Sequence, residues 1–295
     1  MPVRLANNRY GKHRVRVSKV RRPRQAPPNE ETHELVEFAV DVELAGDFEA
    51  AYTDGDNSQV VATDTCKNTV YVLAKDHPLD SPESFGVAIA GHFLQRYPHV
   101  AEARASLTET VWSRLGDSPH GFVAQQQANP TATVTQTRGK SPVVTAGIKK
   151  LSIAKTTESG FVDFHRDEFR TLADTDDRIL ATELSASWTY KDAQVSGNRV
   201  DFAACRTRVT DALVARFVDH YSRSVQETLY LMAESALAAC PEVAPFQQLT
   251  QITLTMPNKH HLLVNLAPFG RENENEVFAV TDEPFGYITA TVVAE

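Results

Sequence analysis

Lys12 and Thr63 are two residues of this sequence whose chemistry suits proton transfer. Lys12 ends the stretch NRYGK at 8–12, where an extended segment begins, and Thr63 lies near the start of a predicted helix. A lysine that loses its proton near neutral pH can act as a general base, and a neighbouring hydroxyl can relay the proton. Taken singly, these residues also fit an exposed strand lysine and a helix cap, for which Asp64 and Thr65 are equally suitable.

A second candidate region is the helix start in the stretch SVQE at 224–227. Ser224 fits the N-cap and Glu227 the N3 position of a capping box, immediately before an apolar helical run. Val225 and Gln226 then occupy the first turn, whose backbone N–H groups lack partners inside the helix and attract anions together with the helix dipole. An ordinary helix start without a ligand explains the same residues.

The stretch MPNKHH at 256–261 contains further candidate polar residues. Pro257 and Asn258 predict a turn between two strands. His260 and His261, without a third ligand, give little support for a metal site. The sequence has no HExxH or paired-cysteine spacing for a metal, and no GxGxxG or GxxxxGK[ST] for nucleotide phosphates. We therefore expect neither a metal centre nor a phosphate-binding loop.

The composition is that of an ordinary globular protein, and 295 residues are enough for two packed units. A net charge of -8 argues against a general nucleic-acid binder, because such proteins use Lys and Arg to neutralise phosphates. Three cysteines without ligand-like spacing fit a reducing cytoplasm better than a secreted disulfide framework. The N-terminus lacks an apolar signal core, and no apolar run approaches the roughly 20 residues that a bilayer requires.

Strand and helix patterns follow the same order in both halves of the chain. Alternating apolar residues predict strands, and helical spacing predicts paired helices, one with Ser81 as N-cap and Pro82 at its first position. Prolines predict a polar loop over 21–32. The first half should contain strands at about 10–20, 35–44, 101–111, 121–125 and 132–138 and helices at about 63–76 and 82–97. The second half should contain strands at about 143–155, 179–190, 248–255 and 261–266 and helices at about 203–220 and 225–239.

Each half therefore has the order β-β-α-α-β-β. Runs of strands around paired helices predict an α+β fold with antiparallel sheets and helices on one sheet face. We place the first unit at residues 1–140 and the second at 141–295. A parallel nucleotide-binding fold is disfavoured.

The order of several short motifs is more specific than any one of them. The chain resembles the urate oxidase family, cofactor-free enzymes that oxidise urate with O2, from Asn8 to about Glu276. Among the motifs given next, PNKH and the combination of VATD with the following KNT are the most specific for this family. The motifs are NRYGK at 8–12, VATDTCKNTVY at 61–71, DRIL at 177–180, SVQETLY at 224–230 and PNKH at 257–260.

Urate oxidases have the tunnelling fold, which is built from β-β-α-α-β-β units and agrees with the order predicted above. The resemblance implies two such units per chain, barrels closed by pairs of subunits, and a homotetramer. It also implies that each active site lies between subunits, with the lysine and threonine from one chain and the purine-clamping residues from its neighbour.

The resemblance assigns roles in proton transfer and O2 binding. Lys12 and Thr63 resemble the catalytic dyad of the family, and His260 resembles the histidine that extends its proton relay. Asn258, together with Thr63, would hold O2 or water over the ring face. Asp64 would contribute its backbone N–H group to the ligand.

The remaining assignments concern the grip on urate. Arg178 and Gln226 resemble the pair that holds the planar substrate from two edges, and their donors and acceptors suit its mixed N–H and C=O edges. Val225 would offer its backbone N–H group to a urate oxygen. Phe161 resembles the aromatic residue that stacks on urate, with Phe164 as a nearby competitor.

No cofactor is implied, because deprotonated urate is electron-rich enough to pass an electron to O2 itself. Two other interpretations remain open. A zinc-dependent tunnelling-fold enzyme acting on a pterin or purine would need clustered Cys and His ligands, and a non-catalytic purine-binding barrel would be expected to lose Lys12 or Thr63. The C-terminus, TVVAE at 291–295, lacks a Ser-Lys-Leu peroxisomal address, so we expect a bacterial cytoplasmic protein.

Overall fold

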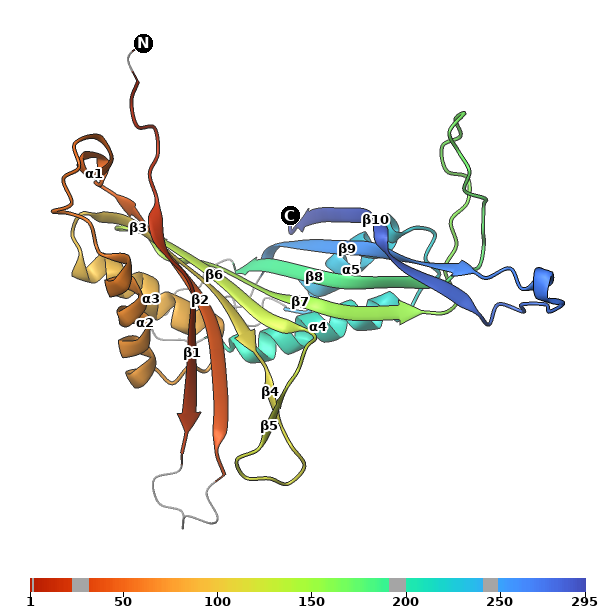
Figure 1. The fold of residues 1–295 in the computed structure, drawn as a ribbon, viewed down its shortest axis with the longest axis horizontal. Coiled ribbons are helices and arrows are strands. Elements are labelled where there is room, and N and C mark those ends of the chain that lie inside the picture. The colour runs from red at the N-terminus through yellow and green to blue at the C-terminus, as the bar shows by residue number, and fades with distance from the viewer. Residues whose placement is uncertain (2, 23–31, 191–199, 241–248) are drawn as a thin grey trace.

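The computed structural model describes residues 1, 3–22, 32–190, 200–240 and 249–295, so the polar loop expected at 21–32 lies mostly outside the described residues. Within these residues, eight strands form one antiparallel sheet in the order β1-β2-β3-β6-β7-β8-β9-β10 (Figure 1), and β4 and β5 form a separate hairpin. The strands are β1 (Tyr10–Arg21), β2 (Glu34–Gly46), β3 (Val100–Thr110), β4 (Trp112–Arg114), β5 (Phe122–Ala124), β6 (Asn129–Thr137), β7 (Val143–Lys155), β8 (Leu180–Tyr190), β9 (Leu249–Leu263) and β10 (Phe278–Val293).

In the described chain, four long helices cover one face of this sheet (Figure 1), which confirms the α+β architecture. They pack as two pairs, one against each half of the sheet. The helices are α1 (Glu49–Thr53), α2 (Thr63–Asp76), α3 (Pro82–Arg96), α4 (Phe202–Val218), α5 (Val225–Ala238) and the 3-10 turn η2 (Ala267–Phe269).

The core lies between the helices and the sheet face beneath them. β2 buries Phe38, Val40 and Val42 at alternate positions, because successive strand side chains point to opposite faces. α3 buries Phe85 and Ile89 at helical spacing, and the rings of Phe38 and Phe85 stack with centroids 6.1 Å apart. Burial of these apolar faces holds the two layers together.

Two predicted helix caps are confirmed. Ser81 Oγ accepts a hydrogen bond from the N–H group of Ser84, and Ser224 Oγ accepts one from the N–H group of Glu227, each at 3.1 Å. The reciprocal half of the capping box is shifted by one residue, because the Glu227 carboxylate accepts from the N–H group of Arg223 at 3.0 Å.

The start of α2 differs from the sequence prediction. Its N-cap residue is Ala62, and no side chain in the described residues caps this end of the helix. The interpretation of Thr63, Asp64 or Thr65 as a capping residue is therefore wrong. Thr63 and Asp64 are the first two helical residues, and both are exposed.

The last two strands also differ from the prediction. β9 runs without a break through Pro257 and Asn258, so the turn predicted there is wrong. The β8–β9 ladder skips Met256 and Pro257, between the pairs Thr182–Asn258 and Ser185–Thr255, so no ladder hydrogen bond is required from the N–H group that proline lacks. β10 was not predicted because Asp282–Pro284 interrupts its apolar pattern and most of its residues are exposed in a single chain.

A repeated backbone feature relates the two halves of the sheet. A β-bulge interrupts β1 between Lys12 and Val15, and another interrupts β7 between Ile148 and Leu151. Arg14 and Lys150 have positive φ values of 56° and 63° at these bulges, and 136 positions separate them. Two β-β-α-α-β-β units are therefore present, while the boundary at 140/141 stays a prediction that falls between β6 and β7.

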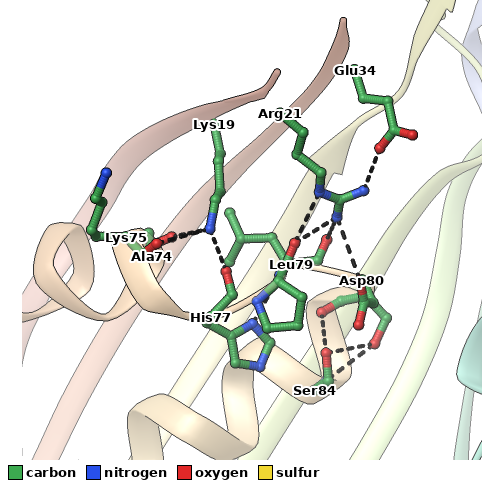
Figure 2. Close-up of polar contacts among 11 residues, drawn as sticks. Lys19, Arg21, Glu34, Ala74, Lys75, His77, Leu79, Asp80 and Ser84 are labelled. Carbon is green, nitrogen blue, oxygen red and sulfur yellow. Dashed lines mark hydrogen bonds and ion pairs between the residues drawn. The ribbon is translucent and has the colours of Figure 1, made fainter. Parts of the chain in front are cut away.

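Lysines near the ends of β1 and β7 bind helix C-termini in both halves. Lys19 Nζ donates to the carbonyl oxygens of Ala74, Lys75 and His77 at 2.9, 3.0 and 2.6 Å (Figure 2). Lys155 Nζ, again 136 positions later, donates to the carbonyl of His220 at 2.6 Å. Carbonyl groups at a helix C-terminus lack helical partners and carry the negative end of the helix dipole, so a lysine there fixes the helix on its strand.

Replacement of Lys19 by Met should lower the free energy of unfolding by roughly 1–3 kcal/mol, because it removes charge-assisted hydrogen bonds to three carbonyls. Chemical denaturation measures this loss. Lys75→Met is the matched control, since its exposed ammonium points away from these carbonyls (Figure 2). Equal destabilisation by the two variants would contradict the proposed role of Lys19.

Candidate active site

Lys12 lies on the helix-covered face of the sheet because of the bulge that follows it. Lys12 is opposite Val42 and Val15 is opposite Val40, and both β2 residues are buried on the helix side. Without an extra residue in β1, the strand period of two would turn Lys12 and Val15 to opposite faces. Asp41 holds the bulge, since its Oδ1 accepts from the N–H group of Arg14 at 2.6 Å.

Tyr10 brings the start of α2 beside Lys12. The Tyr10 hydroxyl accepts a hydrogen bond from the N–H group of Val61 at 2.7 Å, and its ring packs edge-on against Phe48 at 4.9 Å. Tyr10 shares the strand face of Lys12, and Val61 precedes Thr63 by two residues. Burial raises the pKa of Tyr10 to about 12, so the hydroxyl keeps its proton.

The positive charge of Lys12 interacts with the Asp64 carboxylate in the first turn of α2. The pKa of the Asp64 carboxyl is lowered mainly by its hydrogen bond with Lys67, at 2.5 Å, and also by Asn68 and by the charge of Lys12. Since no side chain caps this end among the described residues, the N–H group of Asp64 is available to an anionic ligand. We call Lys12, Thr63 and Asp64 the Lys12 cluster.

Arg178 and Phe161 lie in the segment that joins β7 to β8. The backbone N–H group of Arg178 donates to the Ser159 carbonyl at 2.8 Å, and its Nε donates to Ser159 Oγ at 3.3 Å. Phe161 exchanges backbone hydrogen bonds with Thr175 at 2.6 and 3.1 Å. The Arg178 guanidinium lies 5.5 Å from the centre of the Phe161 ring. Burial lowers the pKa of Arg178, as expected for a cation held partly out of water.

Backbone bonds join this segment to the start of α5. Ser159 forms a parallel bridge with Ser222, and the N–H group of Gly160 donates to the Ser222 carbonyl at 2.8 Å. Ser222 precedes Val225 by three residues. Val225 is buried and Gln226 is exposed at this helix start, so the Gln226 amide can reach a ligand beside Arg178.

Asn258 and His260 approach from β9. Asn258 is opposite Thr182, near the start of β8 and therefore close in sequence to Arg178. Both residues share the strand face of the buried Met256, which is the face that α5 covers. We call Phe161, Arg178, Val225, Gln226, Asn258 and His260 the Arg178 cluster.

Phe161 is better placed than Phe164 to stack on a ligand that Arg178 holds. The two rings stack on each other, with centroids 4.6 Å apart. Arg170 lies 4.3 Å from the centre of the Phe164 ring. The Phe164 ring therefore already packs against both Phe161 and Arg170. Phe161 adjoins Arg178 directly.

One chain keeps the two clusters apart. Lys12 is on the first strand of the sheet and Asn258 and His260 are on the seventh (Figure 1). Six strand spacings of about 4.8 Å place them roughly 29 Å apart along the sheet. The structure therefore gathers the predicted site residues into two groups rather than one.

Sequence reasoning missed the residues that position these clusters. Tyr10, Ser159 and Ser222 act through partners 51, 19 and 63 residues away in sequence, so no local pattern indicates them. In the described part of the chain, no group of three or more His, Cys, Asp or Glu side chains could hold a metal ion. No helix of the described residues is long and apolar enough to cross a membrane.

The paired β-β-α-α-β-β units, with polar clusters at helix starts and on the adjoining strands, define a protein of the tunnelling-fold class. A family model named Uricase matches residues 8–135 and 144–289. The chain belongs to the uricase family. The match extends well beyond Glu276, where the sequence resemblance was expected to end, and includes most of β10.

Individual uricases agree with this assignment. The uricase of Arthrobacter globiformis is 40% identical over 291 residues, which cover 99% of this chain and 90% of that protein. The uricase of Dictyostelium discoideum is 40% identical over 294 residues, which cover 98% of this chain and 96% of that protein. A crystal structure of the Arthrobacter globiformis uricase matches with a TM-score of 0.90 at 38% identity, covering 100% of this chain and 96% of that chain.

Replacement of Gly160 by Ala should disturb the Arg178 cluster. The added Cβ would lie 2.2 Å from the Tyr221 hydroxyl oxygen and 3.0 Å from the Thr175 carbonyl oxygen. Overpacking of this kind costs about 1–3 kcal/mol of folding free energy. Chemical denaturation measures this cost, and amide hydrogen exchange should increase around Phe161 and Arg178.

The matched control combines this change with Tyr221→Phe, which removes the oxygen nearest to the new methyl group. Gly160→Ala should cost clearly less in the Tyr221→Phe background than in the unmodified chain. If Gly160→Ala lowered the free energy of unfolding equally in both backgrounds, the clash with the Tyr221 hydroxyl would not be the cause of the destabilisation.

Proposed function

We propose that this chain is a cofactor-independent urate oxidase that converts urate, O2 and water to 5-hydroxyisourate and hydrogen peroxide in purine degradation. Its membership of the uricase family supports the activity. The observation that carries the mechanism is the division of the site residues into a proton-transfer cluster and a ligand-gripping cluster. Each lies beside a helix start whose backbone N–H groups suit an anion.

The Arg178 cluster grips urate. Arg178 offers a planar fork of donors, and the Gln226 amide offers both a donor and an acceptor to the opposite edge. The N–H group of Val225, in the first turn of α5, binds a urate oxygen. Phe161 stacks on the ring, as its place beside Arg178 favours.

The Lys12 cluster removes protons. Lys12 takes a proton from urate, Thr63 relays it through its hydroxyl, and His260 extends the relay. The N–H group of Asp64 adds a donor to the substrate. Asn258 and Thr63 hold O2 or water over the ring face. Urate loses two electrons, which reduce O2 to peroxide, and water supplies the hydroxyl group of the product. The protein's task is to fix geometry and move protons.

The complete site forms between chains. Lys12, Thr63 and Asp64 of one chain act on urate held by Arg178 and Gln226 of a neighbour, since one chain keeps the two clusters far apart. Both edge strands of the described sheet, β1 and β10, are open in a single chain. β10 exposes large apolar side chains, which suits burial against another subunit in a homotetramer: Val280, Phe285, Tyr287 and Val293.

Replacement of Lys12 by Met should leave urate affinity largely intact and reduce turnover about 10²–10⁴-fold, the usual contribution of a positioned proton acceptor. Absorbance assays of urate consumption measure turnover, and equilibrium titration measures affinity. The control is Lys140→Met, at an exposed turn. Near-normal turnover without Lys12 would rule out its catalytic role.

Mixing two inactive variants tests whether the site is shared. Lys12→Met and Arg178→Gln chains, refolded together in equal amounts, should recover about a quarter of the unmodified turnover. Random pairing of the two variants makes half of the subunit pairs mixed. In each mixed pair, one of the two sites combines an unaltered Lys12 with an unaltered Arg178, and the other site carries both substitutions. Each variant refolded alone is the control. Mixed assemblies without recovered activity would contradict a site shared between chains.

A further inference from the structure

Two cysteines that the proposed reaction does not use lie in contact in the core of the second unit. Cys205 is in α4, and Cys240 follows the end of α5. Their Sγ atoms are 2.8 Å apart, and the residues are 0% and 2% exposed. Sulfur atoms this close need only a small movement to reach disulfide bonding distance.

The surroundings make the two thiols chemically different. The hydrogen bond from Cys205 lowers the pKa of Cys240 most, and Arg208 lowers it further through a hydrogen bond and its charge. The same hydrogen bond raises the pKa of Cys205. One thiol of the pair donates to the sulfur of the other, and the directions of the two pKa shifts favour Cys205 as the donor. The thiolate form is the nucleophile in cysteine oxidation, so Cys240 is the reactive member of the pair.

Cys66 shows the opposite behaviour in the same chain. It lies in α2 and is fully buried, and burial raises the pKa of its thiol to about 11. A thiol held in its protonated form reacts slowly with peroxides. Cys66 is therefore an internal reference for the other two cysteines.

We propose that Cys205 and Cys240 form a peroxide-reactive pair that closes to a disulfide. The Cys240 thiolate attacks one oxygen of hydrogen peroxide, forming a sulfenic acid and releasing hydroxide. Cys205 then displaces the sulfenic oxygen, so that the S–S bond forms and water leaves. In sum, two thiols and one peroxide give one disulfide and two water molecules.

The enzyme's own product is the oxidant in this scheme, and that part rests on the proposed function. Because both sulfurs are buried, peroxide reaches them when the end of α5 opens locally, as helix ends do. Oxidation should therefore be slower than that of an exposed thiolate. The disulfide joins α4 to the end of α5 and should raise the midpoint of thermal unfolding by roughly 5 °C.

Peptide mapping of the unmodified chain tests the proposal. The fully reduced protein is treated with hydrogen peroxide, denatured, alkylated, digested and analysed by mass spectrometry. We expect a Cys205–Cys240 linked peptide that dithiothreitol removes, while Cys66 remains alkylated. Failure to link, or oxidation of Cys240 only to sulfinic acid, would overturn the proposal, as would equal oxidation of all three cysteines.

A second arm replaces added peroxide by urate and air, with and without catalase. We expect linkage that catalase suppresses. Linkage by added peroxide but not by urate turnover would support the thiol pair and count against peroxide release by the proposed function. In the Cys205→Ser variant, dimedone should trap the sulfenic acid of Cys240, whereas Cys66→Ser should link like the unmodified chain. No dimedone adduct in Cys205→Ser would overturn the assigned order of steps.

Discussion

The β-bulge after Lys12 is the constraint on which the Lys12 cluster depends. A regular strand would send Lys12 and Val15 to opposite faces, and the extra residue lets both face the helices. Tyr10 then ties the chain entering α2 to the same face, and Lys19 holds the other end of that helix. The start of α2, where Thr63 and Asp64 lie, is held within reach of the Lys12 charge because α2 is fixed on β1 at both ends.

The second unit repeats this framework without its chemistry. Ile148 precedes the bulge of β7 as Lys12 precedes that of β1, and Phe202 begins α4 as Thr63 begins α2. A buried isoleucine and a phenylalanine cannot move protons. In the proposed function, each chain therefore supplies one proton-transfer cluster, from its first half.

At the helix position of Gln226, the second half carries the residue predicted to bind the ligand, and the first half does not. Gln226 is the second residue of α5 after the Ser224 cap, and Glu83 is the second residue of α3 after the Ser81 cap. Glu83 is fully buried, and both of its carboxylate oxygens accept from Arg206 of α4 at 2.7 Å. A carboxylate engaged in this way joins the two halves of the chain instead of meeting a ligand. In the proposed function, the first half thus supplies the base and the second half supplies the residues that hold urate.

The sequence by itself determined the four long helices, most of the strands, the Ser81 and Ser224 caps and the motifs of the family, because these depend on local periodicity and short-range hydrogen bonds. It did not reveal β10, whose apolar side chains stay exposed in one chain, or the continuous path of β9 through Pro257. Tertiary structure alone decided that Lys12 faces the helices, that Cys205 meets Cys240 and that the site residues form two groups. The reason is physical: those contacts join residues distant in sequence, and their geometry is set by sheet register and helix packing, which no local pattern encodes.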